Sequence, residues 1–177
     1  AWIGAEIAQK QDWIYLLSDH MIRVIDEALL KLADKRLNAP DFDLSDIKIE
    51  DPEFLAQIQY ISDELENGYG FIVIRGLDAQ KYSEAQLANI YYLIGLHMGT
   101  PVTQNARGDL IGFVENVGDK NNKMTRVYET NAYLPYHSDM SDVVGLLSIR
   151  KAKEGGLSSI ISSSTVYNRI LEEYPEY

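Results

Sequence analysis

The chain contains no cysteine among its 177 residues. Disulfide bonds and thiolate metal sites are therefore excluded, and any metal site must use histidine nitrogens and carboxylate oxygens. Histidine is itself scarce, with three residues against 27 Asp and Glu. A transition-metal site would thus depend on one or two particular histidines and on the acidic residues beside them.

Basic residues and long apolar runs are also lacking. The net charge of −11 argues against a nucleic-acid partner, because phosphate binding needs clustered Lys and Arg. No apolar run approaches the roughly 20 residues of a membrane-spanning helix. The first residues have neither the basic nor the apolar region of a signal peptide. We therefore expect a cytoplasmic protein without a membrane partner, and homo-oligomerisation is left open.

The first hundred residues carry helical signals. A length of 177 residues with 46% hydrophobic and 24% charged residues fits one globular domain. We predict a short helix near residues 5–9 and three longer ones at about 19–35, 52–67 and 84–96. Their signals are a cap at Ser18 or Asp19, the Asp51-Pro52 pair and a capping box at Ser83 and Gln86. Apolar stripes predict the buried faces: Met21, Ile22, Ile25, Leu29 and Leu32 in the first long helix, and Phe54, Leu55, Ile58, Ile61 and Leu65 in the second.

Extended runs dominate later. A buried strand is predicted at residues 70–75, and residues 41–49 suit a loop or short edge strand. Further strands are predicted at 110–117, 126–130, 143–149 and 158–162, before a helix at 165–174. This order favours an α+β domain whose sheet is mainly antiparallel.

The most informative stretch contains His137 and Asp139, two positions apart. In an extended segment both side chains point to the same side, and we expect them to converge within a few ångströms. An imidazole and a carboxylate so placed are two members of the two-His-one-carboxylate triad that binds Fe(II). The alternative is a surface histidine beside a turn aspartate. His20 is expected to be exposed, and His97 is expected to be a cation favoured by a helix C-terminus.

The order of segments resembles the amino-terminal half of the taurine/2-oxoglutarate dioxygenase family. The matching segments are residues 71–76, 104–109, the His137–Asp139 stretch, the apolar run 143–149 and Gly155-Gly156-Leu157-Ser158. The resemblance implies a double-stranded β-helix, or jelly roll, with amino-terminal helices. It also implies Fe(II) and 2-oxoglutarate as cofactors, with dioxygen and a small molecule as substrates.

The resemblance also assigns residues. His137 and Asp139 match two iron ligands. Ser158 matches a hydroxyl near a 2-oxoglutarate carboxylate, and the alternative of similar weight is a serine at the exit of a turn. Asn131 could contact the cosubstrate, and Tyr133 and Tyr136 the substrate, with loop packing as the alternative for these three. Gln104 and Asn105 are either pocket residues or turn caps. Because an acidic residue occupies position 139, where related halogenases have a small residue, we expect oxygenation rather than halogenation.

Two expected family residues are not found in this chain: the second iron-binding His and the Arg that pairs with 2-oxoglutarate. A jelly roll also needs about eight strands, and fewer can be recognised. We therefore expect residues 1–177 to be the front part of a single oxygenase domain, inactive alone. Two rivals remain: a non-catalytic jelly-roll binding or scaffold module with an incidental His-x-Asp, and a zinc hydrolase.

Overall fold

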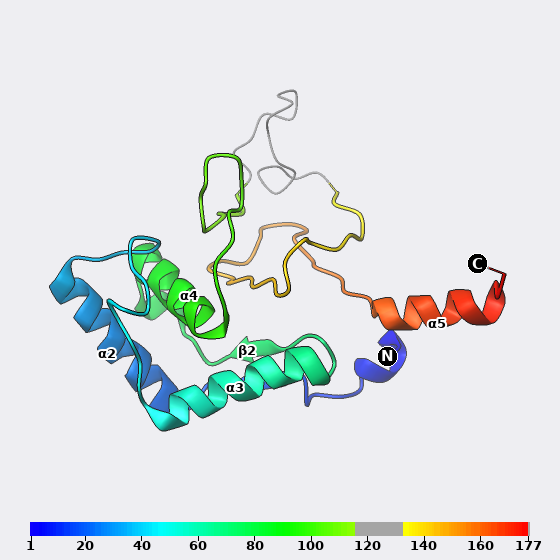
Figure 1. The fold of residues 1–177 in the computed structure, drawn as a ribbon, viewed down its shortest axis with the longest axis horizontal. Helices are drawn as coiled ribbons and strands as arrows, with labels where there is room; N and C mark the ends of the chain where they lie inside the picture. Colours follow the sequence, from blue (N-terminus) through cyan, green and yellow to red (C-terminus); the bar gives the residue numbers. More distant parts are fainter. Residues whose placement is uncertain (116–132, 177) are drawn as a thin grey trace. The chain divides into compact units, whose positions relative to one another are not determined.

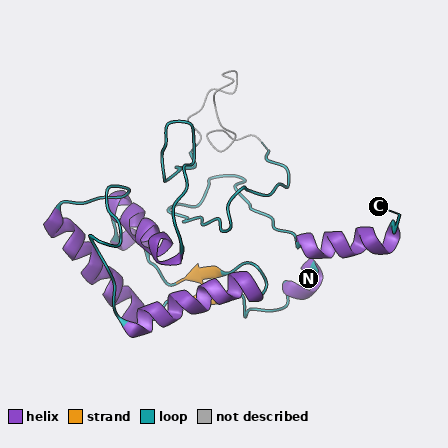
Figure 2. Ribbon diagram, viewed as in Figure 1, coloured by secondary structure: helices purple, strands orange, loops and turns teal. Residues whose placement is uncertain are grey.

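The computed structural model describes residues 1–115 and 133–176. The chain divides into two compact units. The first comprises Ala1–Gly99 together with Leu146–Tyr177, and the second comprises Thr100–Gly145. Figure 1 labels some of the elements, and Figure 2 shows that helix far exceeds strand in the described part. In order they are α1 (Gly4–Ile7), β1 (Ile14–Leu16), α2 (Asp19–Lys35), α3 (Pro52–Asn67), β2 (Val73–Arg75), the 3-10 helix η1 (Ala79–Lys81), α4 (Glu84–Met98) and α5 (Ser163–Glu173).

The predicted start signals of the three long helices are confirmed. The Ser18 side chain accepts a hydrogen bond from the backbone N–H of residue 21, and Asp51 caps α3 in the same way. Ser83 and Gln86 form the reciprocal capping box of α4. Each cap satisfies backbone donors that the first turn of a helix leaves without an intrahelical partner. Local sequence therefore fixes where these helices begin.

The core of the first unit lies between α2, α3 and α4, which contact one another in pairs. Its largest fully buried side chains are Phe54, Met21, Ile25, Leu32, Ile61, Leu87, Ile90 and Leu93. The predicted stripes are largely confirmed. The prediction that Leu55 is buried is wrong, because this residue is 40% exposed. It follows Phe54 by one residue, which turns it about 100° around the helix and away from the core.

One buried polar residue ties a loop to this core. Asn89 of α4 is only 5% exposed. Its Oδ1 accepts the backbone N–H of Ala39 at 2.7 Å, and its Nδ2 donates to Oδ1 of Asn38 at 3.3 Å. Because a buried amide must be hydrogen-bonded to avoid a desolvation cost, Asn89 fixes the chain after α2 against α4.

The sheet differs from the prediction. β1 and β2 pair in parallel, with Ile14 opposite Val73 and Leu16 opposite Arg75. The strand expected at 70–75 is confirmed at Val73–Arg75, but its residues are half-buried or exposed rather than buried. The sequence pattern did not indicate β1, which is a short segment between a turn and a helix cap.

The strands predicted at 143–149 and 158–162 are not formed in this structure, in which both segments are irregular. Their apolar side chains are exposed, as Leu146 at 76% and Ile160 at 56% illustrate. Residues 110–115 are also irregular, and the remainder of that predicted strand, the turn at 118–123 and the strand at 126–130 lie outside the described residues. An apolar run forms a strand only when another strand accepts its backbone hydrogen bonds.

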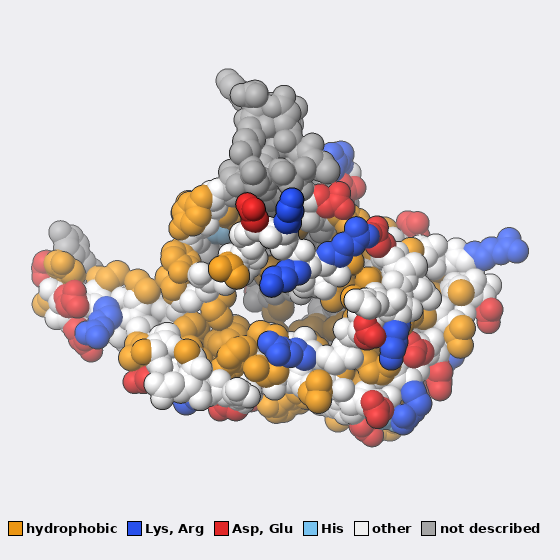
Figure 3. All heavy atoms as spheres, turned by 180° about the vertical axis from the view of Figure 1, so that it is seen from behind, with side chains coloured by type: hydrophobic (Ala, Val, Ile, Leu, Met, Phe, Trp, Pro, Cys, Tyr) orange, Lys and Arg blue, Asp and Glu red, His pale blue; other side chains and the backbone are white. Residues whose placement is uncertain are grey.

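The last helix was predicted nearly correctly. α5 begins after Ser162, whose side chain accepts the backbone N–H of Thr165 at 3.2 Å. The Thr165 hydroxyl donates to the carbonyl oxygen of Trp2 at 2.7 Å. The apolar residues of α5 remain exposed, Tyr167 at 64% and Leu171 at 52%. Hydrophobic atoms reach the surface on the face drawn in Figure 3. The described chain is thus a mixed, helix-rich α and β structure.

Among the helices of residues 1–115 and 133–176, none combines the length and apolar character that crossing a membrane requires.

Candidate metal centre

His137 and Asp139 lie on an irregular segment of the second unit. Leu134 precedes a proline, which disfavours helical backbone at residue 134, and the chain bends at Tyr136, directly before the histidine. The Nε2 atom of His137 lies 3.9 Å from Oδ1 of Asp139. The convergence predicted from their two-residue spacing is confirmed. Both side chains are about half exposed, 47% and 53%, so a small ligand can reach them.

The second ring nitrogen of His137 has a partner of its own. Nδ1 lies 2.8 Å from the carbonyl oxygen of Pro135. The ring thus has a hydrogen-bond partner on one edge, the carbonyl of the chain before it, while its other edge lies 3.9 Å from the Asp139 carboxylate. Pro135 is a residue of this site that the sequence reasoning did not single out, although a proline two positions before the histidine was a visible signal.

The pair fits a divalent transition metal in its chemistry. A neutral imidazole nitrogen and a carboxylate oxygen are the donor types that non-haem iron binds. With metal–ligand bonds of about 2.1 Å, two ligands at right angles stand about 3.0 Å apart. The observed 3.9 Å must therefore shorten by roughly 1 Å, which rotation of two half-exposed side chains can accomplish. Within the described residues, no group of three His, Cys, Asp or Glu side chains forms a metal site.

The other predicted site residues are not gathered by the described contacts. Tyr133 and Tyr136 precede the pair in sequence, and these residues are 82% and 59% exposed. Ser158 is exposed on an irregular segment of the first unit. Asn131 lies outside the described residues. Their assigned roles therefore stay predictions.

Asn105 acts as a turn cap in this structure. Its Oδ1 accepts the backbone N–H of Arg107 at 2.9 Å, and its Nδ2 donates to the Asp109 carboxylate at 2.7 Å. The Asn105 amide, followed by the Arg107 guanidinium, lowers the pKa of Asp109. Gln104 bonds the nearby carbonyl of Val102 at 2.9 Å. Of the two roles left open by the sequence, the structure supports the turn for both residues.

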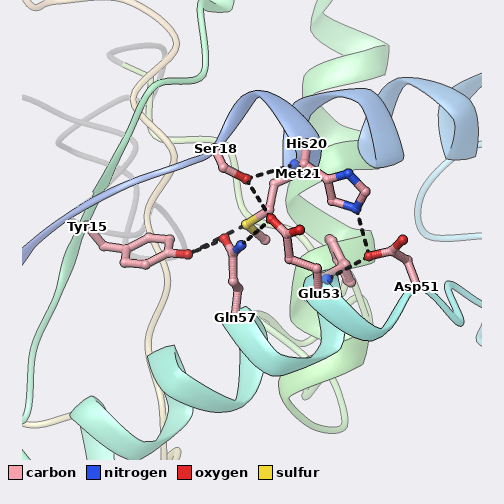
Figure 4. Close-up of polar contacts among 8 residues, drawn as sticks. Tyr15, Ser18, His20, Met21, Asp51, Glu53 and Gln57 are labelled. Carbon is pink, nitrogen blue, oxygen red and sulfur yellow. Dashed lines mark hydrogen bonds and ion pairs between the residues drawn. The ribbon is translucent and has the colours of Figure 1, made fainter.

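The other two histidines have partners within the first unit. His20 Nε2 lies 2.9 Å from Oδ1 of Asp51, where the first turns of α2 and α3 come together (Figure 4). The Phe54 backbone N–H, and then His20, lower the pKa of Asp51. The prediction that His20 is exposed is wrong, because only 34% of its side chain is accessible and the residue is half-buried.

His97 sits near the end of α4, as predicted, but its surroundings are apolar. Its ring packs edge to face against Phe54, with the ring centroids 5.3 Å apart. Nδ1 lies 2.9 Å from the carbonyl oxygen of Leu93, one turn earlier. Nε2 is buried and has no hydrogen-bond partner among the described residues.

The sequence matches the family described as Taurine catabolism dioxygenase TauD, TfdA family, over residues 26–177. The chain belongs to this family, which confirms the resemblance found in its motifs. Members of the family are generally Fe(II)- and 2-oxoglutarate-dependent, and the family implies a jelly-roll fold.

Two relatives align with nearly the whole chain. FR-33289 synthase of Streptomyces rubellomurinus is 32% identical over 177 residues, covering 99% of this chain and 52% of the relative. A taurine hydroxylase-like protein, SAT17, of Stachybotrys chartarum is 26% identical over 184 aligned positions, covering 99% and 47%. The chain therefore spans about half the length of the curated relatives it matches.

Proposed function

We propose that the protein is an Fe(II)- and 2-oxoglutarate-dependent dioxygenase that oxidises a small molecule. The observation that carries the proposal is the convergence of His137 and Asp139, 3.9 Å apart, in a chain of this dioxygenase family. The similarity to a taurine hydroxylase-like protein supports hydroxylation as the reaction.

In this proposal His137 Nε2 and the Asp139 carboxylate hold the iron. The third ligand and the Arg that anchors 2-oxoglutarate are assigned to a part of the protein that corresponds to the remaining length of the relatives. When bound, iron and 2-oxoglutarate supply the oxidising chemistry, in which one atom of dioxygen enters succinate as CO2 leaves and the other enters the substrate as a hydroxyl group. Ser158 and Asn131 are assigned to 2-oxoglutarate, and Tyr133 and Tyr136 to the substrate.

The proposal includes the jelly-roll fold. The apolar segments at 143–149 and 158–162 have the composition of core strands, yet their side chains are exposed here. We assign them to a double-stranded β-helix that is completed when strands of the whole protein pair with them. Residues 1–177 then form the front part of one oxygenase domain. A cytoplasmic location, homo-oligomerisation and the absence of a nucleic-acid partner stay predictions.

The test measures succinate released by the full-length protein with Fe(II), ascorbate, 2-oxoglutarate and a panel of small molecules. His137→Ala and Asp139→Ala should both lose turnover. Asp142→Ala, an exposed carboxylate on the same unit, is the matched control and should retain it. The proposal is contradicted if the protein releases no succinate with any of the small molecules and also releases none when they are left out.

Metal analysis separates the rival classes. Protein prepared without oxygen should contain or take up iron at the His137–Asp139 pair. Stoichiometric zinc with a zinc-dependent hydrolysis would support the hydrolase reading. A protein that binds neither metal would support a binding or scaffold module.

A further inference from the structure

The feature that carries a further inference is the Asn67-Gly68 pair, where α3 ends. It is the one Asn-Gly pair in the sequence, and both residues are exposed. Asparagine is chemically labile, because the backbone nitrogen of the next residue can attack its side-chain amide. Glycine favours this attack, since it has no Cβ to hinder it and adopts a wide range of backbone conformations. The end of α3 therefore carries the local chemistry of a deamidation site.

Deamidation at this pair consumes only water. The Gly68 nitrogen loses its proton and forms a bond to Cγ of Asn67, the Cγ–Nδ2 bond breaks, and ammonia leaves. Water then opens the resulting cyclic imide at either carbonyl group. One product is aspartate, and the other is isoaspartate, in which the main chain runs through the side-chain carbon. The reaction needs no oxidant, metal ion or second substrate.

The fold requires the glycine that makes the pair reactive. A Cβ atom at residue 68 would lie 2.7 Å from the carbonyl oxygen of Glu64 and would also meet the Glu64 side chain. Because real side chains do not approach a backbone oxygen so closely, α3 can end in this way only with glycine at this position. The φ of Gly68 is −94°, so it is this close approach, and not a left-handed backbone, that selects glycine.

A hydrogen bond holds the attacking nitrogen away from Asn67. The Gly68 N–H donates to the carbonyl oxygen of Glu64 at 3.1 Å and so closes the last turn of α3. While this bond is formed, the nitrogen is directed at the preceding turn, and Asn67 is fixed in helical backbone. Attack on Cγ therefore requires the last turn to open.

The last turn of α3 is weakly held. It carries Glu64 and Glu66 but no basic residue. The C-terminal end of a helix has a partial negative charge, which repels carboxylates. A further hydrogen bond to the Glu64 carbonyl, from the N–H of Gly70, is long at 3.4 Å. Because the free energy of opening approaches zero where helix ends fray, we expect this turn to open often.

The residue that follows the pair holds a tryptophan. The carbonyl oxygen of Tyr69 accepts a hydrogen bond from Nε1 of Trp2 at 2.8 Å, and the Trp2 ring packs edge to face against Phe71 at 5.3 Å between centroids. Isoaspartate lengthens the main chain by one carbon directly before this contact. Either product also adds a carboxylate to a helix end that already carries two, which favours the open turn.

We propose that Asn67 deamidates spontaneously in the native protein, that opening of the last turn of α3 controls the rate, and that conversion releases Trp2 from its contact with Tyr69. The proposal concerns a modification of the chain itself and does not depend on oxygenase activity.

The experiment follows conversion of the full-length protein in mildly alkaline buffer by tryptic digestion and mass spectrometry. The tryptic peptide of residues 49–75 contains Asn67 as its one asparagine. Aspartyl and isoaspartyl forms of this peptide are separated by chromatography. The folded protein should convert at Asn67 roughly 10-fold more slowly than the same protein unfolded in urea, because only the open fraction reacts.

A charge variant tests whether the helix end controls the rate. Glu66→Lys places a cation at the C-terminal end of α3, so conversion in the folded protein should slow by roughly 5-fold while the rate in urea stays the same. Glu173→Lys makes the same exchange at the exposed end of α5 and is the matched control, which should change neither rate.

Tryptophan fluorescence tests the consequence. The chain has two Trp residues, so Trp13→Phe leaves Trp2 as the one emitter. Its emission should move to longer wavelength in step with conversion, as Trp2 becomes more exposed to water. The double variant with Asn67→Gln, whose longer side chain cyclises far more slowly, should show no such shift over the same time.

Three results would overturn the inference. Equal rates in folded and urea-unfolded protein would mean that the Gly68 hydrogen bond does not control the reaction. A folded protein that keeps Asn67 intact while the unfolded protein converts completely would mean that the last turn of α3 does not open. Conversion without a change in Trp2 emission would refute the release of Trp2 from Tyr69.

Discussion

Replacing His97 with Phe should stabilise the protein, which is an uncommon expectation for a substitution at a partly buried residue. The His97 ring packs against Phe54 and buries an Nε2 that has no hydrogen-bond partner among the described residues. Leaving a polar atom buried and unpaired costs about 1–3 kcal/mol. Phenylalanine removes that atom and keeps an aromatic ring against Phe54.

The opposing terms are smaller. The substitution removes the hydrogen bond from Nδ1 to the Leu93 carbonyl, which is worth about 0.5–1.5 kcal/mol. No acceptor is orphaned, because in an α-helix that carbonyl also accepts the backbone N–H of residue 97. The balance favours the variant by about 1 kcal/mol, which corresponds to a rise in Tm of about 2–4 °C for a domain of this size.

The assay is urea unfolding of the full-length protein at about pH 8, with the slope m compared so that only a change in stability is counted. His20→Phe is the control with the opposite sign, because His20 has a partner in Asp51 at 2.9 Å and its loss should destabilise. A loss of more than about 1 kcal/mol in His97→Phe would refute the reasoning.

Three further predictions concern the site and the helix caps. Asp139→Ala should abolish hydroxylation, and mass spectrometry should find no chlorinated product from the native enzyme in chloride buffer. The depressed pKa of Asp51 means that its contribution to stability is present above about pH 3.9, the unfolded value, and is lost as the pH falls through the folded value. Asp51→Asn keeps a capping side chain and loses the charge beside His20, so it should be less stable than wild type at pH 7, and thermal unfolding should show this deficit shrinking as the pH falls through the folded value. Ser83→Ala should cost about 1 kcal/mol, with a non-additive effect in combination with Gln86→Ala, measured by a double-mutant cycle.

The helices of the first unit could be predicted because their signals are local. A cap and the residue that it satisfies lie three positions apart, as Ser18 and Met21 do, and the buried stripe repeats within one helix. The feature of these helices that could not be predicted depends on tertiary contacts. Asn89 is buried because the chain after α2 folds back onto it, and nothing in its own helix indicates that.

Strands depend on partners that are distant in the chain, and prediction was weaker there. β1 and β2 are separated by more than fifty residues, and only their pairing makes Ile14–Leu16 a strand. The apolar runs at 143–149 and 158–162 have strand composition, yet they remain irregular, because composition supplies no hydrogen-bonding partner.

The candidate metal site combines residues that are local in the sequence with a ligand that is distant from them. The approach of His137 and Asp139 follows from a spacing of two residues in extended chain, and it was predictable. The third ligand of an iron triad is not local to these two, so a short motif cannot specify it. The Pro135 contact extends what is local by two residues, since a carbonyl at position −2 reaches Nδ1 while a carboxylate at position +2 lies near Nε2. The local signal therefore spans Pro135 to Asp139, in which a backbone carbonyl and a carboxylate lie beside the two nitrogens of one imidazole.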